Sequence, residues 1–245
     1  MSGREEALAG RAFGEAASEY VAGRPSYPAE SVAWVVGDAR DVADVGAGTG
    51  KLTAGLVGSG RRVHAIEPDA GMLGALRREV PGASALQGSA EALPLPDASV
   101  DAVVFGQAWH WVDVPRASAE AARVLRPGGV LGLLWNIRDS SVDWVHRLGA
   151  TMQQSAAERA IETDAVRVDP PFGPLTKHER RWTRPMTADQ LVAMAASRSY
   201  VIALDPGERD DLLSEVRALL RTHPDTAGRD VIDMPYTTVA FRTAR

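Results

Sequence analysis

The sequence contains no cysteine, no excess of positive charge and no long hydrophobic run. The absence of thiols excludes disulfides, zinc sites built on thiolates, and cysteine nucleophiles. A net charge of −5 and a pI near 5.6 differ from those of a basic nucleic-acid-binding domain, so we expect no nucleic-acid partner. No apolar run reaches the length of a membrane span, and the N-terminus lacks the apolar core of a signal peptide. These absences predict a cytoplasmic protein without a membrane partner. We expect either a monomer or a homodimer.

Short apolar runs alternate with helical patterns between about residues 39 and 136. The runs are rich in Val, Ile, Leu and Ala and lack polar alternation, which is typical of buried strands in a parallel sheet. Strands that alternate with helices indicate βαβ units. Two further strands are predicted later, one around His178–Thr183 and one in the C-terminal stretch YTTVAFRTA. We therefore expect an α/β fold with a mostly parallel sheet.

No linker is visible in the chain, so we expect one domain over residues 1–245. It would consist of an N-terminal helical segment over residues 1–38, an α/β core over 39–136, and helical insertions with the last two strands over 137–245. Within the last part, residues 141–162 have the pattern of one long helix.

Helix boundaries are indicated by capping residues. Asp69, Thr187 and Asp205 each precede a helical pattern and can accept a hydrogen bond from its first turn. Pro127 with the Gly128–Gly129 pair is predicted to end a helix and turn the chain into the fifth strand.

The strongest local motif is DVADVGAGTGKLT, in which a strand runs into Gly46, Gly48 and Gly50 and then into a helix. Glycines at this position permit a tight turn and let a ligand approach the backbone, so a nucleotide-like cofactor is expected there. A glycine-rich turn without a ligand is the alternative. The spacing G-x-G-x-G differs from the dinucleotide fingerprint G-x-G-x-x-G, and Leu52 after Lys51 excludes a P-loop.

A second motif, HAIEPDAGML, places Glu67 at the end of the second strand, about 20 residues beyond the glycines. A carboxylate there can accept hydrogen bonds from both hydroxyls of a ribose. Met72 would face the space beside the ribose, where a thioether packs well on adenine. The alternative for Glu67 is a surface acid at a strand end.

The stretch FGQAWHWVDV follows the fourth strand and sets His110 between Trp109 and Trp111. His110 would line an acceptor pocket, where it could be a general base, or the stretch would simply pack on the next helix. Strand alternation would point both tryptophans one way and His110 the other, unless a turn breaks the pattern at this strand end. After the fifth strand, Asn136 and Arg138 lie at the same edge, where Arg138 would bind an acidic substrate or form a surface salt bridge.

Together these motifs resemble the class I S-adenosylmethionine-dependent methyltransferases. The resemblance rests on D-x-G-x-G-x-G, the Glu-Pro-Asp after the second strand, QGSAEALPLPD and VLRPGG. More narrowly, FGEAASEYVAGRPSYP, AWHWVD, WNIRD and SRSYV resemble small-molecule enzymes similar to the trans-aconitate methyltransferases. The resemblance implies a Rossmann-like seven-stranded sheet flanked by helices, with an antiparallel last strand. It also implies that residues 1–38 form a helical lid over the cofactor and that residues 39–136 form the cofactor-binding core.

The resemblance also implies roles for individual residues. The glycines would run under the amino-acid part of the cofactor, Glu67 would hold the ribose, and Ser89 stands where the family usually has an Asp for the adenine amino group. The cofactor-binding residues would be Arg24, Asp44, Gly46, Ala47, Gly48, Gly50, Glu67, Met72, Ser89, Ala90 and Gln107. The substrate would be contacted by Tyr20, Trp109, His110, Asn136 and Arg138.

The expected function is transfer of a methyl group from S-adenosylmethionine to a small molecule without a metal, because no metal-ligand spacing is present. Two alternatives stay open at this point: an NAD-dependent oxidoreductase and a non-catalytic cofactor-binding protein of the same fold. The tetrapeptide Asp169–Phe172 matches a motif of amino-methylating enzymes, but it lies about 60 residues beyond the fourth strand, so it is predicted to be a loop feature.

Overall fold

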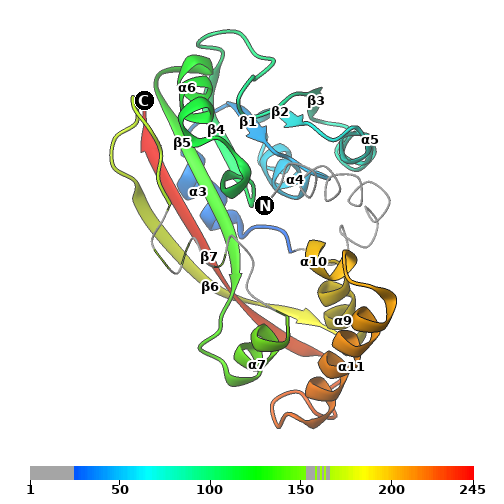
Figure 1. The fold of residues 1–245 in the computed structure, drawn as a ribbon. Coiled ribbons are helices and arrows are strands. Elements are labelled where there is room, and N and C mark those ends of the chain that lie inside the picture. Colours follow the sequence, from blue (N-terminus) through cyan, green and yellow to red (C-terminus); the bar gives the residue numbers. More distant parts are fainter. Residues whose placement is uncertain (1–24, 153–157, 159–160, 162, 164–165) are drawn as a thin grey trace. The chain divides into compact units, whose positions relative to one another are not determined.

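The fold is described from a computed structural model, which describes residues 25–152, 158, 161, 163 and 166–245 (Figure 1). The chain divides into two compact units. One unit contains residues 26–137, 156–180 and 238–245, and we call it the sheet unit. The other contains residues 138–155 and 181–237 together with the N-terminal stretch up to Pro25, and we call it the helical unit.

Seven strands form one sheet in the order β3-β2-β1-β4-β5-β7-β6. The pairs β1–β2, β2–β3, β1–β4 and β4–β5 are parallel, and β7 is antiparallel (Figure 1). This topology confirms the predicted Rossmann-like α/β fold. The strand bounds are β1 Asp41–Val45, β2 Arg62–Glu67, β3 Ser84–Gln87, β4 Val100–Gly106, β5 Leu125–Arg138, β6 Thr176–Met186 and β7 Ile232–Ala244.

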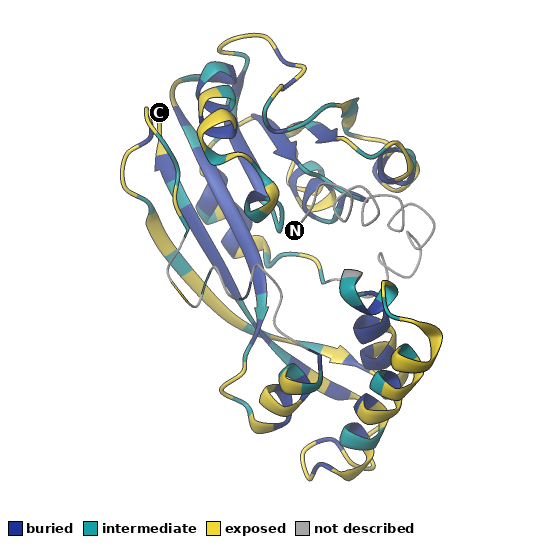
Figure 2. Cartoon of the chain, in the orientation of Figure 1, coloured by how far each residue is buried: buried dark blue, intermediate teal, exposed yellow. Residues whose placement is uncertain are grey.

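Helices cover the two faces of the sheet because successive strand residues point to opposite sides. In β4, Val103 and Phe105 belong to the apolar cluster that includes α6 (Val114–Val124). Ala102 and Val104 belong instead to the cluster that includes α3 (Ala29–Val36) and α4 (Lys51–Gly58). The helix α5 (Ala70–Glu79) contacts β2 and β3. Both faces of the central strands β1 and β4 are therefore largely buried, as Figure 2 shows, and this explains their continuous apolar runs.

The predicted lid over residues 1–38 needs correction at its C-terminal end. Residues 1–24 lie outside the described residues, but α3 is part of the sheet unit's core. Val35 of this helix is fully buried, and a Cβ at Gly132 of β5 would lie 2.0 Å from its Cγ1. The glycine thus allows α3 to pack directly on the strand, and α3 is not a lid.

The helical unit has its own apolar cluster, formed by α7 (Asp143–Thr151), α9 (Ala188–Ala196) and α11 (Pro206–Thr222) with the nearby ends of strands. A fourth, short helix is α10 (Ser199–Ile202). The capping box predicted at Thr187 is present, and the Asp205 side chain accepts a hydrogen bond from the Glu208 N–H. These capping interactions confirm the two predicted helix starts.

Two predicted boundaries were wrong. The helix expected over residues 141–162 ends at Thr151 in the structure, and much of the remainder lies outside the described residues. α6 already ends at Val124, and β5 begins at Leu125, so Pro127 lies within a strand rather than ending a helix. The reason is that Leu125 already pairs with Val100, and the irregularity in this ladder accommodates the proline and glycines that follow.

Candidate cofactor site at the carboxyl ends of the parallel strands

The carboxyl ends of β1, β2, β4 and β5 lie at one edge of the sheet unit, where ligands of open α/β sheets bind. The loop after β1 contains three glycines with positive φ: +67° at Gly46, +57° at Gly48 and +91° at Gly50. Left-handed backbone is strained for residues with a Cβ, so the glycines are required by the course of the chain. The motif therefore forms a tight turn whose left-handed backbone leads into α4.

The glycines differ in what surrounds them. A Cβ at Gly46 would lie 2.7 Å from the Cβ of Ala108, and one at Gly50 would lie 2.8 Å from Cγ2 of Val80. A Cβ at Gly48 would meet nothing within 4 Å. Gly46 and Gly50 are thus needed for packing, whereas Gly48 faces open space in which a ligand can approach the backbone.

Glu67 joins the glycine loop to the N-cap residue of α5 through its two carboxylate oxygens. Its Oε2 accepts a hydrogen bond of 2.8 Å from the Gly48 N–H, and its Oε1 accepts one of 3.0 Å from the Asp69 N–H. Burial raises the pKa of Glu67, while these two hydrogen bonds act in the opposite direction. Glu67 is only 6% exposed, so the alternative of a surface acid is wrong. Each oxygen retains a further acceptor site, which a ribose hydroxyl can use.

Asp44 is completely buried at the end of β1. Its Oδ2 accepts a hydrogen bond of 2.6 Å from the Thr53 hydroxyl of α4, whereas its Oδ1 is buried without a hydrogen-bond partner in the described structure. Burial raises the pKa of Asp44 to about 7, the nearby Glu67 charge adds to this, and the Thr53 hydrogen bond opposes it. A buried acceptor without a donor costs free energy, and a bound cation or N–H group would remove that cost.

The adenine side of the predicted site is formed by α5 and the loop after β3. Asp69 caps α5 by accepting a hydrogen bond of 2.8 Å from the Met72 N–H, which confirms the predicted cap. Met72 is buried, Ala90 belongs to the same core cluster as α6, and Ser89 forms an isolated bridge with Ala92. Their predicted contacts with adenine stay predictions.

His110 lies in a short 3-10 helix, Trp109–Trp111, rather than in an extended strand end. Trp109 is 3% exposed and packs edge-on against Phe105, whereas Trp111 is 63% exposed. The expected alternation, with both tryptophans on one side, was therefore wrong because a 3-10 turn separates neighbouring side chains by about a third of a turn. The indole N–H of Trp109 donates to the carbonyl of Arg167, so its observed contacts are those of packing.

The His110 ring has a defined polar partner. Nε1–H of Trp135, at the end of β5, donates a hydrogen bond of 3.2 Å to Nδ1 of His110. An indole is only a donor, so Nδ1 must accept, and the proton of the neutral imidazole is on Nε2. Because Ala108 lies against Gly46, the 3-10 helix that carries His110 begins beside the glycine loop.

Asn136 and Gln107 link the strand ends to each other. The Gln107 side-chain NH₂ donates to the Asn136 carbonyl over 2.9 Å, and the Asn136 side chain accepts from the Thr238 hydroxyl over 2.6 Å. The NH₂ group of Asn136 donates to the Ser26 carbonyl over 3.2 Å. Both oxygen and nitrogen of the Asn136 amide are thus used within the protein, and these contacts do not favour its predicted role in substrate binding.

Tyr27 was not predicted as a site residue. A Cβ at Gly106, the last residue of β4, would lie 2.9 Å from the Tyr27 hydroxyl and 3.1 Å from Cδ2 of Leu52. The tyrosine therefore lies over the carboxyl end of β4, between the strand and the start of α4. Gly106 directly after an apolar strand is the one sequence signal that could have indicated this close approach.

Three predicted site residues are left, two near the N-terminus and one at the end of β5. Arg24 and Tyr20 lie outside the described residues. Arg138 belongs to the helical unit, where it is 7% exposed and its guanidinium lies 3.5 Å from the sulfur of Met152. The alternative of a surface salt bridge for Arg138 is therefore wrong, and its role toward a substrate stays a prediction.

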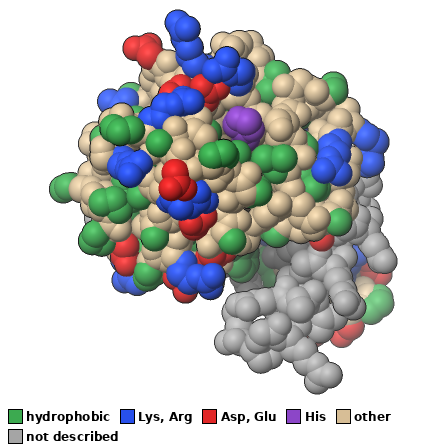
Figure 3. Space-filling view, turned by 90° about the horizontal axis from the view of Figure 1, so that it is seen from above, with side chains coloured by type: hydrophobic (Ala, Val, Ile, Leu, Met, Phe, Trp, Pro, Cys, Tyr) green, Lys and Arg blue, Asp and Glu red, His purple; other side chains and the backbone are tan. Residues whose placement is uncertain are grey.

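The rest of the described chain adds no competing site of the kinds considered. No group of three or more His, Asp or Glu side chains within it could hold a metal ion, and none of its helices is long and apolar enough to cross a membrane. Phe172 packs in the core and the Asp169 N–H donates to Ser118 of α6, as expected of a loop feature. On the face in Figure 3, basic and acidic side chains are intermixed.

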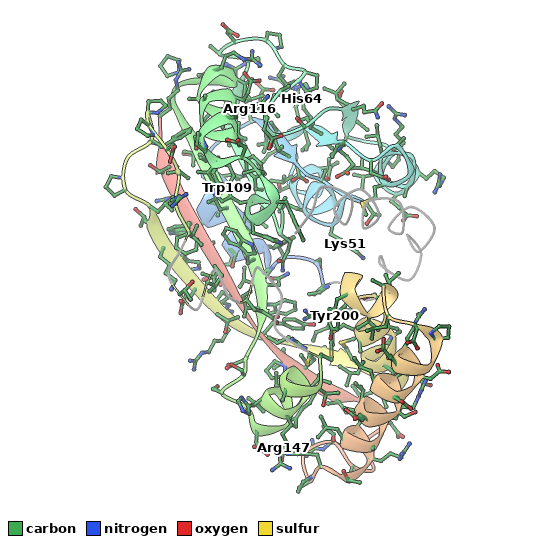
Figure 4. The ribbon with its side chains drawn as sticks, in the orientation of Figure 1. Lys51, His64, Trp109, Arg116, Arg147 and Tyr200 are labelled. Atoms are coloured by element: carbon green, nitrogen blue, oxygen red, sulfur yellow. The ribbon has the colours of Figure 1, made fainter. Side chains whose placement is uncertain are left out.

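The residues at this edge fit the cofactor that the glycine motif implies. The open side of Gly48 accommodates a ligand against the loop, and the partnerless Asp44 Oδ1 suits a cationic group. Glu67 adds acceptor sites suited to ribose hydroxyls. Lys51, labelled in Figure 4, begins the helix whose first-turn N–H groups point toward the same loop.

Comparisons with known proteins show which family the chain belongs to. A methyltransferase domain profile matches residues 43–133, which contain the glycine loop and Glu67. An uncharacterized methyltransferase of Mycobacterium tuberculosis is 46% identical over 94% of both chains, and one of Schizosaccharomyces pombe is 30% identical over 97% of this chain and 98% of its own. The solved structure of a proposed type II methyltransferase from Anaeromyxobacter dehalogenans is similar, with a TM-score of 0.64, 28% identity, and coverage of 90% of this chain and 97% of that one. The chain therefore belongs to the class I S-adenosylmethionine-dependent methyltransferases.

Proposed function

We propose that this enzyme methylates a small molecule at the carboxyl edge of the sheet unit, without a metal ion. The observation that supports this most directly is the glycine loop. Its Gly48 N–H donates a hydrogen bond to Glu67, and the carboxylate of Asp44 is buried just before the loop. The subgroup motifs that resemble the trans-aconitate methyltransferases favour a small organic acid as the acceptor. We propose no nucleic-acid or membrane partner, and either a monomer or a homodimer.

The bound cofactor would supply an activated methyl group on a sulfonium, whose transfer is an in-line displacement. The protein then has two tasks, alignment of the acceptor and exclusion of water. Asp44 would hold the cofactor's ammonium group, Glu67 its ribose, and Met72 and Ala90 would border its adenine. Tyr27 and Ala108, at the end of β4, would limit the space next to the glycine loop.

We assign His110 the role of a hydrogen-bond donor toward the acceptor rather than a general base. With Nδ1 accepting from Trp135, the proton of the neutral ring is on Nε2, which would donate it to an oxygen of the bound acceptor. A base would need a vacant lone pair at that nitrogen. A donor suits an acceptor that is already an anion, such as a carboxylate, because such an oxygen attacks without losing a proton.

Two measurements test this function. Calorimetry should show that S-adenosylmethionine and S-adenosylhomocysteine bind and that NAD does not. Formation of S-adenosylhomocysteine should then be followed across small carboxylic acids, phenols and quinone precursors, with and without EDTA. Turnover with an acid that survives EDTA supports the proposal. Turnover that is lost with EDTA and restored by magnesium rejects metal independence, and turnover only with phenols rejects the acid acceptor.

A further inference from the structure

A pocket lies entirely within the helical unit. None of the residues that line it belongs to the cofactor site. The pocket has a volume of about 290 Å³ and is formed by the start of α9, the last turns of α11 and the loop that follows α11. Figure 1 shows α9 and α11 packed beside each other, in agreement with their close backbone contacts. The residues that line the pocket include Asp189, Val192, Arg217, Leu220, Arg221 and Arg229.

Three of the lining residues are arginines, and only Asp189 opposes them. Three positive charges against one negative charge leave a surplus of two at the pocket. Arg217 and Arg221 are four residues apart on α11, so their side chains share one helix face and repel each other. Such an arrangement lowers the stability of a helix unless an anion compensates the charges.

These arginines also lack the ion pairs that other arginines of the chain have. Arg62, Arg123 and Arg147 each lie within 3.0 Å of a carboxylate oxygen. Within the described residues, the side chains of the three pocket arginines have no hydrogen bond or ion pair. Their guanidinium groups therefore retain their full capacity to donate hydrogen bonds to a ligand.

Buried residues hold the base of the pocket in a fixed position. Leu220 and Val192 are both buried in the apolar cluster of the helical unit. The Thr226 hydroxyl, also buried, donates to the Leu220 carbonyl over 2.9 Å and fastens the loop to α11. Gly228, with a φ of +72°, then turns the chain and brings Arg229 to the rim. The arginines thus project from a fixed scaffold.

We propose that this pocket binds the phosphate group of a small phosphate monoester. Two elements supply three guanidinium groups around one cavity, which matches a dianion with three terminal oxygens better than a planar carboxylate, for which one bidentate arginine suffices. The buried Leu220 and Val192 would contact the apolar part of the molecule that carries the phosphate. The pocket would hold a second ligand in addition to the methyl donor and acceptor.

The test is a calorimetric titration of the full chain with inorganic phosphate and with glycerol 3-phosphate at constant ionic strength. Saturable binding of both is expected. Arg217→Gln and Arg221→Gln should each weaken it about tenfold, because each removes a charge-assisted hydrogen bond. The matched control is Arg116→Gln, an exposed helical arginine outside the pocket, labelled in Figure 4, which should leave binding unchanged.

Any of three results would overturn the proposal. One is the absence of saturable binding of either phosphate compound. Another is an equal loss of affinity in Arg116→Gln, which would show that only the total charge of the protein matters. Binding of glycerol 3-phosphate without inorganic phosphate would also reject it, because the phosphate group would then not be the recognised part. Circular dichroism of each variant shows whether the glutamine substitutions leave the fold intact.

Discussion

Trp135 at the end of β5 donates its indole N–H to Nδ1 of His110 over 3.2 Å, and this contact places the proton of the neutral imidazole on Nε2. The ¹⁵N NMR spectrum of protein labelled in histidine should therefore show His110 as the Nε2–H tautomer. His110→Gln identifies the signal by its loss, and Trp135→Phe should produce a mixture of tautomers. A neutral His110 protonated on Nδ1 in the unaltered protein would contradict the proposed donor role.

The same role predicts an order of activities. Gln places an amide N–H near the position of Nε2, whereas Ala leaves no donor, so His110→Gln should retain more turnover on the true acceptor than His110→Ala. Loss of one hydrogen bond to a charged oxygen is worth about tenfold in rate. Equal, unchanged turnover in both variants would assign His110 to packing alone, while equal binding of S-adenosylmethionine in both confirms that the cofactor site is intact.

Asp44 predicts a pH dependence of stability. Its pKa of about 7 in the folded protein lies above the ordinary value of 3.8, so between these values the folded chain holds a proton that the unfolded chain has released. The free energy of unfolding without cofactor should consequently fall as the pH rises toward 7, by at most about 1.4 kcal/mol per pH unit, and level off above it. Asp44→Asn should remove this slope in denaturant titrations, whereas Asp38→Asn, at an exposed position, should retain it.

A related expectation concerns cofactor affinity. A cationic group next to Asp44 Oδ1 favours the charged carboxylate, so binding of S-adenosylmethionine should release a proton near neutral pH. Calorimetry in buffers of different ionisation enthalpy measures this release directly. An affinity that rises from about pH 6 to 8 in the unaltered protein but not in Asp44→Asn is the expected result; the same pH profile in both would exclude Asp44 as the ammonium partner.

Glu67→Gln should damage both the loop and the cofactor site. The carboxylate accepts from two backbone N–H groups, those of Gly48 and Asp69, and an amide can accept from only one of them through its oxygen. Leaving a buried donor unsatisfied costs about 1–3 kcal/mol, which a thermal melt would detect. Glu79→Gln, an exposed glutamate at the end of α5, provides the control and should change neither stability nor cofactor affinity.

Gly46→Ala and Gly48→Ala form an informative pair. Both introduce a Cβ at positive φ, which costs about 1–2 kcal/mol. Only at Gly46 does the new atom also lie 2.7 Å from Ala108, so this variant should be the less stable one. Gly48→Ala should instead lose affinity for S-adenosylmethionine by more than its stability loss explains. Equal melting temperatures for the two variants would mean that the space beside Gly46 is not limiting.

The part of the fold that sequence predicted well is governed by local interactions. Asp69 and Thr187 cap helices through N–H groups only three residues away, so their motifs contain the necessary information. The family assignment likewise followed from the glycine loop and Glu67, which are close in sequence.

The contacts that determine the function of His110 are not local. Trp135, which contacts His110, lies 25 residues beyond it in the sequence. Tyr27, which contacts the end of β4 at Gly106, lies far before that strand in the sequence. The 3-10 turn at Trp109 could not be read from alternation because it depends on how that indole packs on Phe105 and reaches Arg167. The predicted long helix after residue 141 also differs from the structure, because periodicity alone does not indicate that α7 ends at Thr151.

The amide of Asn136 has a consequence for how the protein can be engineered. Through it, Ser26 before α3 and Thr238 in the last strand are bonded to one side chain of β5. A deletion that removes the strand from Thr238 onward would therefore also release the segment that enters α3, more than 200 residues earlier in the sequence. Within the sheet unit, the Asn136 amide connects the beginning and the end of the described chain, so a change at either position should alter the local structure at the other.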